Sequence, residues 1–147
     1  MSGQFEATVE VDRPVEEVFA YLADGRHDPE FSPRVLEIDK SPDGPTAVGT
    51  VFRSRVKDAG MKTSREFRIT RLEEPRTIRW SERSRNLITA DGGYDLEPLP
   101  DGRTRVRIFN ELEGHGLGRL LLKPALLAAR KDAPAFGARI KAAVERS

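Results

Sequence analysis

Most of the chain alternates apolar and polar side chains with a period of two, and this pattern limits the possible fold more than any other feature. Such a period is the signature of a half-buried strand. The expected strands are 5–11, 36–38, 48–57, 62–72, 76–84, 87–97 and 103–113. The last five are separated only by short segments at 58–61, 73–75, 85–86 and 98–102. Because parallel strands need long crossovers, these short connections predict antiparallel hairpins in chain order.

Two short helical segments follow the first expected strand. Pro14 is favoured at the start of a helix, and apolar residues from Val15 to Leu22 follow it at helical spacing. This helix is expected to end before Gly25. A second helical piece is expected near 28–31 and is closed by Pro33.

The last third of the chain changes to helical spacing again. Apolar residues from Leu117 to Val144 suit one long amphipathic helix, in which Pro124 and Pro134 predict kinks or a broken start. A meander of strands has one face to cover, and this helix is the natural cover. The sequence therefore predicts a single α+β domain over 1–147, with a curved seven-stranded antiparallel sheet.

Composition excludes several classes of protein. The chain has no cysteine, which rules out disulfides, thiolate nucleophiles and cysteine metal sites. Its 25 basic and 24 acidic residues leave a net charge of +1, so there is no large overall field to attract nucleic acid or anionic lipid. No signal peptide and no membrane span is apparent. We expect a cytoplasmic protein without integral membrane association, and the abundance of Arg, Ala, Gly and Pro hints at a bacterial source.

Hairpin geometry predicts which side chains face the helix. The loop at 58–61 would pair Lys57 with Lys62, and therefore Phe52 with Phe67. The turn after residue 72 would pair Leu72 with Thr77. The predicted inner face then comprises Phe52, Val56, Phe67, Ile69, Ile78, Trp80, Ile88, Ala90, Gly92, Tyr94, Leu96, Val106, Ile108, Asn110 and Leu112. The small residues Ala90 and Gly92 are expected to leave room, and Gly92–Gly93 predicts a bulge or bend.

The same register turns polar residues inward. They are Ser54, Arg65, Glu82, Tyr94 and Asn110. Arg65 and Glu82 are diagonal neighbours on adjacent strands and are expected to reach each other. Buried charges must pair, reach water or meet a polar ligand group, so the pair is either part of a site or a strand end that reaches solvent.

The opposite face of the sheet is rich in arginine. Its basic residues are Arg53, Arg55, Arg68, Arg79, Arg83, Arg105 and Arg107. A basic sheet can track phosphates, but the aromatic side chains that would stack on bases point inward here. We therefore expect an ordinary solvated face and no nucleic-acid partner.

Sequence motifs for catalysis or cofactors are weak. The segment 114–118 (GHGLG) lacks the spacing of a phosphate-binding loop and predicts a flexible entry to the helix, with a gate as a further interpretation. His27 and His115 are isolated and belong to no metal-ligand motif. No G-x-S-x-G is present. We expect no metal and no cofactor.

Several segments together resemble one known family. They are 11–19 (VDRPVEEVF), 31–35 (FSPRV), 47–53 (AVGTVFR), 69–75 (ITRLEEP), 94–98 (YDLEP), 102–106 (GRTRV) and 140–145 (IKAAVE). In order and spacing, over nearly the whole chain, the sequence is similar to the polyketide cyclase/dehydrase-like branch of the START-like (SRPBCC) superfamily. The resemblance implies the helix-grip fold, in which a curved sheet grips the C-terminal helix around a cavity. Its matched motifs are structural, so no catalytic residue carries over.

Three functions remain open at this point. The leading hypothesis is binding of an apolar or aromatic molecule, lipid- or polyketide-like, between sheet and helix. The expected lining is Phe52, Ser54, Arg65, Phe67, Trp80, Glu82, Ala90, Gly92, Tyr94, Ile108, Asn110, Leu121 and Phe136. The second is a cofactor-free cyclase or dehydratase with Glu82 as base and Arg65 and Tyr94 as donors. The third is a co-chaperone-like or other interaction module that uses the basic outer face or the 114–118 loop.

Overall fold

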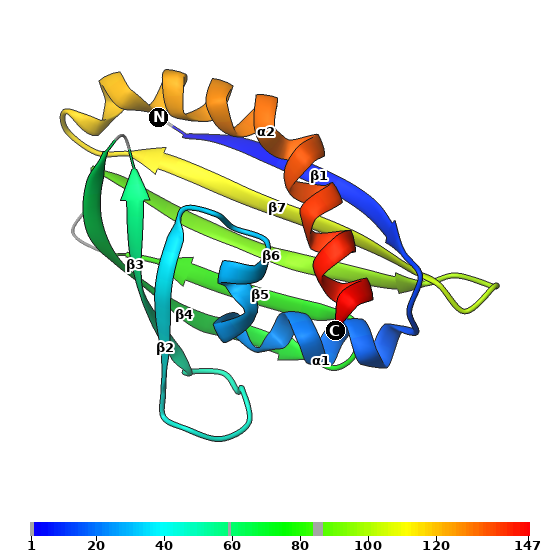
Figure 1. Ribbon diagram of the computed structural model, residues 1–147. Helices are drawn as coiled ribbons and strands as arrows, with labels where there is room; N and C mark the ends of the chain where they lie inside the picture. Colours follow the sequence, from blue (N-terminus) through cyan, green and yellow to red (C-terminus); the bar gives the residue numbers. More distant parts are fainter. Residues whose placement is uncertain (1, 59, 84–86) are drawn as a thin grey trace.

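The computed structural model describes residues 2–58, 60–83 and 87–147 (Figure 1). Its elements follow the expected order of one strand, two short helices, six strands and one long helix. They are β1 (Ser2–Val11), α1 (Val15–Ala23), η1 (Gly25–Glu30), β2 (Val35–Ser41), β3 (Val51–Asp58), β4 (Met61–Glu73), β5 (Thr77–Glu82), β6 (Ile88–Pro98), β7 (Thr104–Gly114) and α2 (Gly118–Arg146). The separator predicted at 85–86 lies outside the described residues, as do Ala59 and Ser84.

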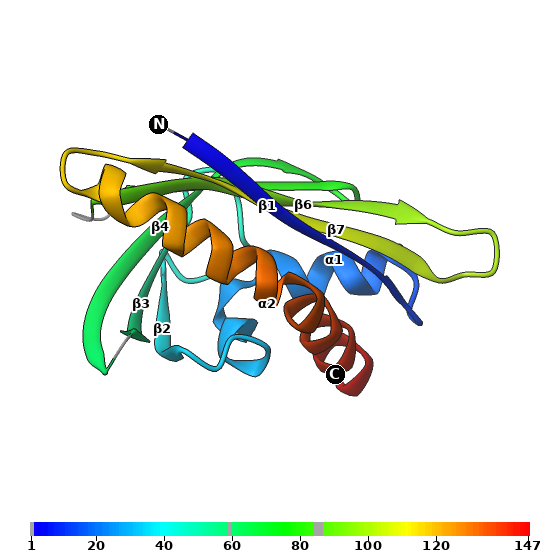
Figure 2. The same cartoon turned by 90° about the horizontal axis from the view of Figure 1, so that it is seen from above.

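The strands form one antiparallel sheet in the order β1-β7-β6-β5-β4-β3-β2. In Figures 1 and 2 the sheet is strongly curved, and α1 and α2 lie on the same side of it. Helix α2 packs mainly against β1, β7 and β6, whereas η1 contacts β2. This is the helix-grip arrangement predicted from the sequence: a curved sheet with one long helix across its concave face.

The predicted register of the central strands is confirmed, with one local exception. Lys57 pairs with Lys62 and Phe52 with Phe67. The prediction for the next turn is wrong, because Leu72 pairs with Ile78 and not with Thr77. A register shift between Ile69 and Arg71 then restores the predicted pairing of Ile69 with Trp80. A bulge adds one residue to one strand, so it compensates a turn that is misplaced by one.

The two adjacent glycines of β6 do not form the predicted bulge. Pairing with both neighbours is continuous, with Gly92 opposite Trp80 on β5 and opposite Asn110 on β7. The space above Gly92 is occupied: a Cβ placed there would lie 2.1 Å from Asn110 Oδ1 and 2.5 Å from the Phe109 carbonyl oxygen. The small residue therefore admits the Asn110 side chain and leaves no empty room.

A Gly92→Ala substitution should lower the free energy of unfolding by about 3 kcal/mol. The methyl group must displace Asn110 and also push against a backbone oxygen, and overpacking of this kind costs about 1–3 kcal/mol before any hydrogen bond is lost. Urea denaturation followed by circular dichroism measures the change.

The matched control is Gly3→Ala in β1. There the nearest atom to the added Cβ is Leu126 Cδ1 at 2.2 Å, the far end of a flexible side chain that can rotate away. We expect a change below about 1 kcal/mol for this control. Equal effects of the two substitutions would contradict the close packing assigned to Gly92.

Helix α2 runs without a break through Pro124 and Pro134. The predicted broken start is therefore wrong, whereas the alternative of kinks agrees with the change of direction visible along α2 in Figure 1. Each proline removes one backbone hydrogen bond and bends the helix around the sheet. None of the described helices is long and apolar enough to cross a bilayer.

Candidate functional site

An aromatic row crosses the inner face of the sheet, one ring per strand from β3 to β6. It consists of Phe52, Phe67, Trp80 and Tyr94. Successive ring centroids lie 5.1 Å, 6.3 Å and 5.1 Å apart. Phe52 and Tyr94 at the two ends are buried, but Phe67 and Trp80 in the middle are only half-buried. These two rings lie on β4 and β5, whereas α2 packs mainly against β1, β7 and β6, and their half-burial leaves one part of the inner face accessible to solvent.

Trp80 carries a fixed polar contact at this accessible part. Its indole Nε1 donates a hydrogen bond of 3.1 Å to Asn110 Oδ1, which lies over Gly92. The indole N–H and the amide of Asn110 thereby hold each other in place. Because an amide can make further hydrogen bonds, Asn110 can also meet a polar group of a bound molecule.

Arg65 and Glu82 form the ion pair that their diagonal positions predict. Arg65 Nη1 lies 3.6 Å from Glu82 Oε1, with side-chain exposures of 31% and 12%. Ser54 of β3, which pairs with Arg65 of β4, is buried. The pair lies beside the aromatic row and reaches water through Arg65.

The remaining predicted lining residues divide into two groups. Ile108 is buried in the core and Ala90 is half-buried on the inner face. Leu121 and Phe136, both on α2, do not join the aromatic row. Leu121 is 51% exposed. Phe136 instead packs edge-on against Phe31, with 5.8 Å between ring centroids.

Asp28 in η1 is a functional candidate that sequence patterning missed. Burial, followed by the negative charge of Asp24, raises the pKa of its carboxyl from 3.8 to about 8. No hydrogen bond to this carboxyl is found within residues 2–58, 60–83 and 87–147. The carboxyl is therefore mostly protonated at neutral pH and can donate a proton.

Asp28 is electrostatically coupled to the end of the aromatic row. Burial raises the pKa of Tyr94 well above 10.0, and the charges of Asp28 and Tyr21 raise it further. Both tyrosine hydroxyls thus lie within electrostatic range of the Asp28 carboxyl. The neutral Asp28 carboxyl and the neutral Tyr94 hydroxyl are therefore two hydrogen-bond donors in a largely apolar setting, whereas the Tyr21 hydroxyl donates its proton to Glu30.

The geometry of η1 explains why Asp28 turns inward. A 3₁₀ helix has three residues per turn, so Gly25, Asp28 and Phe31 share one face. Gly25 and Phe31 are both buried, and Gly25 lies so close to Phe52 that an added Cβ would be 3.0 Å from its ring. Gly25 and Phe31, each three residues from Asp28 in the sequence, were the available signal.

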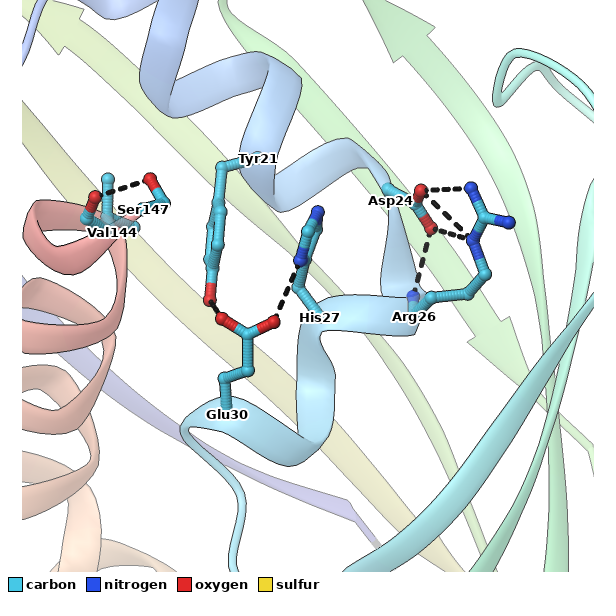
Figure 3. A network of polar contacts seen from close by, with 7 residues as sticks. All are labelled: Tyr21, Asp24, Arg26, His27, Glu30, Val144 and Ser147. Atoms are coloured by element: carbon cyan, nitrogen blue, oxygen red, sulfur yellow. Dashed lines mark hydrogen bonds and ion pairs between the residues drawn. The ribbon is translucent and has the colours of Figure 1, made fainter.

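Contacts of Tyr21 hold η1 against α1, and further polar contacts lie within η1 and at its N-terminal cap (Figure 3). The Tyr21 hydroxyl donates to Glu30 Oε1 at 2.7 Å, and His27 Nδ1 lies 3.1 Å from Glu30 Oε2. The rings of Tyr21 and His27 stack with centroids 4.2 Å apart. Asp24 caps η1 by accepting from the Arg26 backbone N–H at 3.0 Å.

These contacts also shift the pKa values of Tyr21 and Glu30. Burial, and next the hydrogen bond to Glu30, raise the pKa of Tyr21 above its usual value. The hydrogen bonds from Tyr21 and His27 lower the pKa of Glu30. His27 is thus part of a structural contact at the surface, in keeping with the interpretation of an isolated histidine.

Two hollows of the described structure are lined by none of the four rings of the aromatic row. One, of about 410 Å³, is lined mostly by outward-facing residues of β2, β3 and β4, together with Ser54 and Arg65. The other, of about 330 Å³, lies between α1 and the loop after β2. The elongated cavity that the resemblance implies is neither of these, so the accessible part of the inner face is the candidate binding surface.

Most arginines of the outer face form ion pairs. Arg79 and Arg107 both contact Asp95, at 2.7 Å and 3.1 Å, and Arg107 also contacts Glu6. The guanidinium groups of Arg79 and Arg107 also lie over the ring of Phe109, at 4.8 Å and 4.5 Å from its centroid. This network is typical of a solvated sheet face. In the part of the chain that the structure describes, no group of acidic residues or histidines could hold a metal ion.

Solved structures share this fold over almost the full chain. An aromatase/cyclase, Zhui, from Streptomyces sp. R1128 superposes with a TM-score of 0.82 at 19% identity, covering 99% of this chain and 95% of that one. A START superfamily protein from Mycobacterium smegmatis gives 0.70 at 17% identity, covering 95% and 97%. The di-domain aromatase/cyclase StfQ from the steffimycin biosynthetic pathway gives 0.77 at 15% identity, covering 99% and 50%. At these identities the likeness shows the fold alone.

Sequence comparison gives a family but no close relative. No curated protein matches the chain. The model of the family described as polyketide cyclase / dehydrase and lipid transport matches residues 2–146. This span contains every strand and helix of the structure, from β1 to α2. The chain therefore belongs to the polyketide cyclase/dehydrase and lipid transport family.

Proposed function

We propose that this protein binds a small apolar or aromatic molecule on the inner face of its sheet, beside the aromatic row. The observation that carries the proposal is the incomplete burial of Phe67 and Trp80 at the middle of that face. A large aromatic side chain contributes most to the free energy of binding when the ligand removes it from water. Phe67 and Trp80 lie on β4 and β5, whereas α2 packs mainly against β1, β7 and β6. A flat apolar ligand laid against them would complete their burial.

Polar groups around the row would orient such a ligand. The Arg65–Glu82 ion pair and Asn110 lie beside the middle of the row, while Tyr94, near the raised-pKa carboxyl of Asp28, is one of its ends. A few polar groups around an apolar surface suit a molecule with oxygen atoms at its periphery, such as an aromatic polyketide. The family membership and the fold shared with aromatase/cyclases support this class of ligand.

A thermal-shift screen with fatty acids, aromatic polyketides and steroid-like molecules tests the proposal. We expect a ligand of one class to raise the melting temperature, since binding to the folded state alone stabilises it. Phe67→Ala should reduce this shift, because Phe67 is half-buried on the inner face. Phe109→Ala is the matched control, since Phe109 is half-buried on the outer face. Equal loss in both variants, or no shift with any class, would count against inner-face binding.

A second candidate function, cyclase or dehydratase activity, is favoured by Asp28. Its carboxyl is protonated near neutral pH and can serve as a general acid toward a ligand carbonyl or a departing hydroxyl. Glu82, with Arg65 and Tyr94 as donors, is the alternative catalytic group. General acid–base catalysis contributes about 10²–10⁴-fold, so Asp28→Asn should slow turnover of a poly-keto thioester by at least about 100-fold.

Glu82→Gln tests the alternative catalytic group in the same assay. A large loss in Glu82→Gln with little change in Asp28→Asn would transfer the catalytic role to the Arg65–Glu82 pair. Unchanged turnover in both variants would reject a carboxyl acid–base mechanism on this face. Ligand affinity measured on the same variants separates loss of binding from loss of chemistry.

A further inference from the structure

The first half of α2 turns large apolar side chains to solvent. Four leucines at its start are exposed: Leu117 by 71%, Leu120 by 77%, Leu121 by 51% and Leu127 by 65%. The buried side of the same segment is already supplied by Leu122 and Leu126. The exposed leucines are therefore not needed to hold α2 on the sheet.

These residues form one continuous stripe with a basic flank. With 3.6 residues per turn, Leu120, Pro124 and Leu127 follow each other along the outer side of the helix, and Leu117 and Leu121 lie next to them. Arg119, Lys123 and Arg130 are spaced to line one border of this stripe, and all three are exposed. No acidic residue occurs between Leu117 and Lys131.

The patch extends onto the neighbouring strand end. Leu87, just before β6, is 45% exposed, and its carbonyl oxygen accepts a hydrogen bond of 2.8 Å from the His115 N–H. A Cβ on Gly118 would lie 2.0 Å from this same oxygen, so the start of α2 is in contact with Leu87. We call Leu87, Leu117, Leu120, Leu121 and Leu127 with Arg119, Lys123, Arg130 and Lys131 the leucine–arginine face.

We propose that the leucine–arginine face docks the protein on the surface of an anionic lipid bilayer. Exposed leucines on one side of a helix with lysine and arginine at the border is the pattern of a helix that lies in a membrane interface. The basic side chains would contact lipid phosphates while the leucines enter the region between headgroups and acyl chains. The nearly neutral net charge of +1 does not oppose this, because the positive charge is local.

Charge complementarity favours a bilayer over a second copy of the chain. In a two-fold symmetric dimer the same patch faces itself. Four positive side chains without an acidic partner on the segment would then be brought together, which is unfavourable. An anionic lipid surface instead supplies the opposite charge and the apolar phase at once. The docking surface is separate from the aromatic row, and its test needs no ligand on the inner face.

Vesicle flotation tests the proposal with the full chain. We expect binding to vesicles of phosphatidylcholine mixed with phosphatidylglycerol, and much weaker binding to phosphatidylcholine alone. Binding should fall in about 0.5 M salt, where charges are screened over a few ångströms. The double substitution Leu120→Ser with Leu127→Ser, and separately Lys123→Glu with Arg130→Glu, should each lower the partition coefficient by at least about tenfold.

Leu36→Ser with Val48→Ser is the matched control, because these residues are also exposed, by 47% and 64%, but lie outside the face. It should leave binding unchanged, and circular dichroism should give the same spectrum for all variants. Absence of binding to anionic vesicles, or an equal loss in the control, would overturn the proposal. The proposal would also be overturned if the wild type were a dimer that does not bind vesicles and the leucine substitutions converted it to a monomer. The leucine–arginine face would then be an interface between copies of the chain.

Discussion

Replacing Phe52 with alanine should lower the free energy of unfolding by about 4 kcal/mol, within the range found for buried phenylalanines. Phe52 is fully buried, its ring stacks on Phe67 at 5.1 Å between centroids, and Gly25 of η1 rests directly on it. The vacated space is bounded by a sheet and by the start of a helix, so it can collapse only partly. Denaturant unfolding followed by circular dichroism measures the loss.

Phe109→Ala provides the comparison for this prediction. Phe109 lies half-buried on the outer face under the guanidinium groups of Arg79 and Arg107. Its removal leaves the inner packing intact and should cost about 1–2 kcal/mol. If Phe52→Ala cost no more than Phe109→Ala, the contact between η1 and the aromatic row would not be a part of the core.

The stability of the protein should fall as the pH rises from about 5 to about 7, by about 1.4 kcal/mol per pH unit, through Asp28 alone. In the unfolded chain this carboxyl loses its proton near 3.8, whereas in the folded protein it keeps it until about 8. Between these values the folded state binds one proton more, so raising the pH favours unfolding. Below pH 3.8 the Asp28 carboxyl is protonated in both states, and its contribution to stability is fully present. Above about pH 8 it is ionised in both states, and stability falls no further through Asp28.

Asp28→Asn isolates this contribution, because asparagine does not titrate. From about pH 5 to about pH 7, the wild type should lose about 3 kcal/mol of unfolding free energy relative to the variant. Asp39→Asn on β2 is the control for the loss of a carboxylate, since the Asp39 side chain is exposed. Parallel profiles for the wild type and Asp28→Asn would contradict a buried carboxyl with a raised pKa.

The sequence was sufficient for the order of elements and for most of the sheet register. Short separators fix hairpin pairing, and the apolar residues of each strand had to share one face, which left a single consistent register for Phe52, Phe67 and Trp80. The bulge between Ile69 and Arg71 was not predicted, because it shifts the pairing of β4 with β5 by only one residue. Alternation alone cannot distinguish a turn that is longer by one from a bulge inside the strand.

The candidate site was only partly predictable. Arg65, Glu82, Trp80 and Asn110 followed from the register, since Arg65 and Glu82 are diagonal neighbours on adjacent strands and Trp80 and Asn110 both lie opposite Gly92 of β6. Asp28 did not, because its inward position depends on the 3₁₀ geometry of η1, and a spacing of three has a different meaning in an α-helix.

The face of α2 was harder still to predict. Residues 120–127 (LLLKPALL) place leucines on every side of the helix, so periodicity could not tell Leu122, which is buried, from Leu121, which is exposed. The side of such a helix that meets the sheet is decided by packing against β1 and β7, which no local pattern reports.

Fluorescence of Trp80 is the most direct test of binding at the aromatic row. The chain has a single tryptophan, so selective excitation reports on this one position, where the indole is half-buried and hydrogen-bonded to Asn110. Titration with a ligand found by thermal shift should change the Trp80 emission to saturation, and Phe67→Ala should weaken the affinity while Phe109→Ala should not. A ligand that binds with full affinity but leaves Trp80 emission unchanged would place the binding site elsewhere and contradict the account.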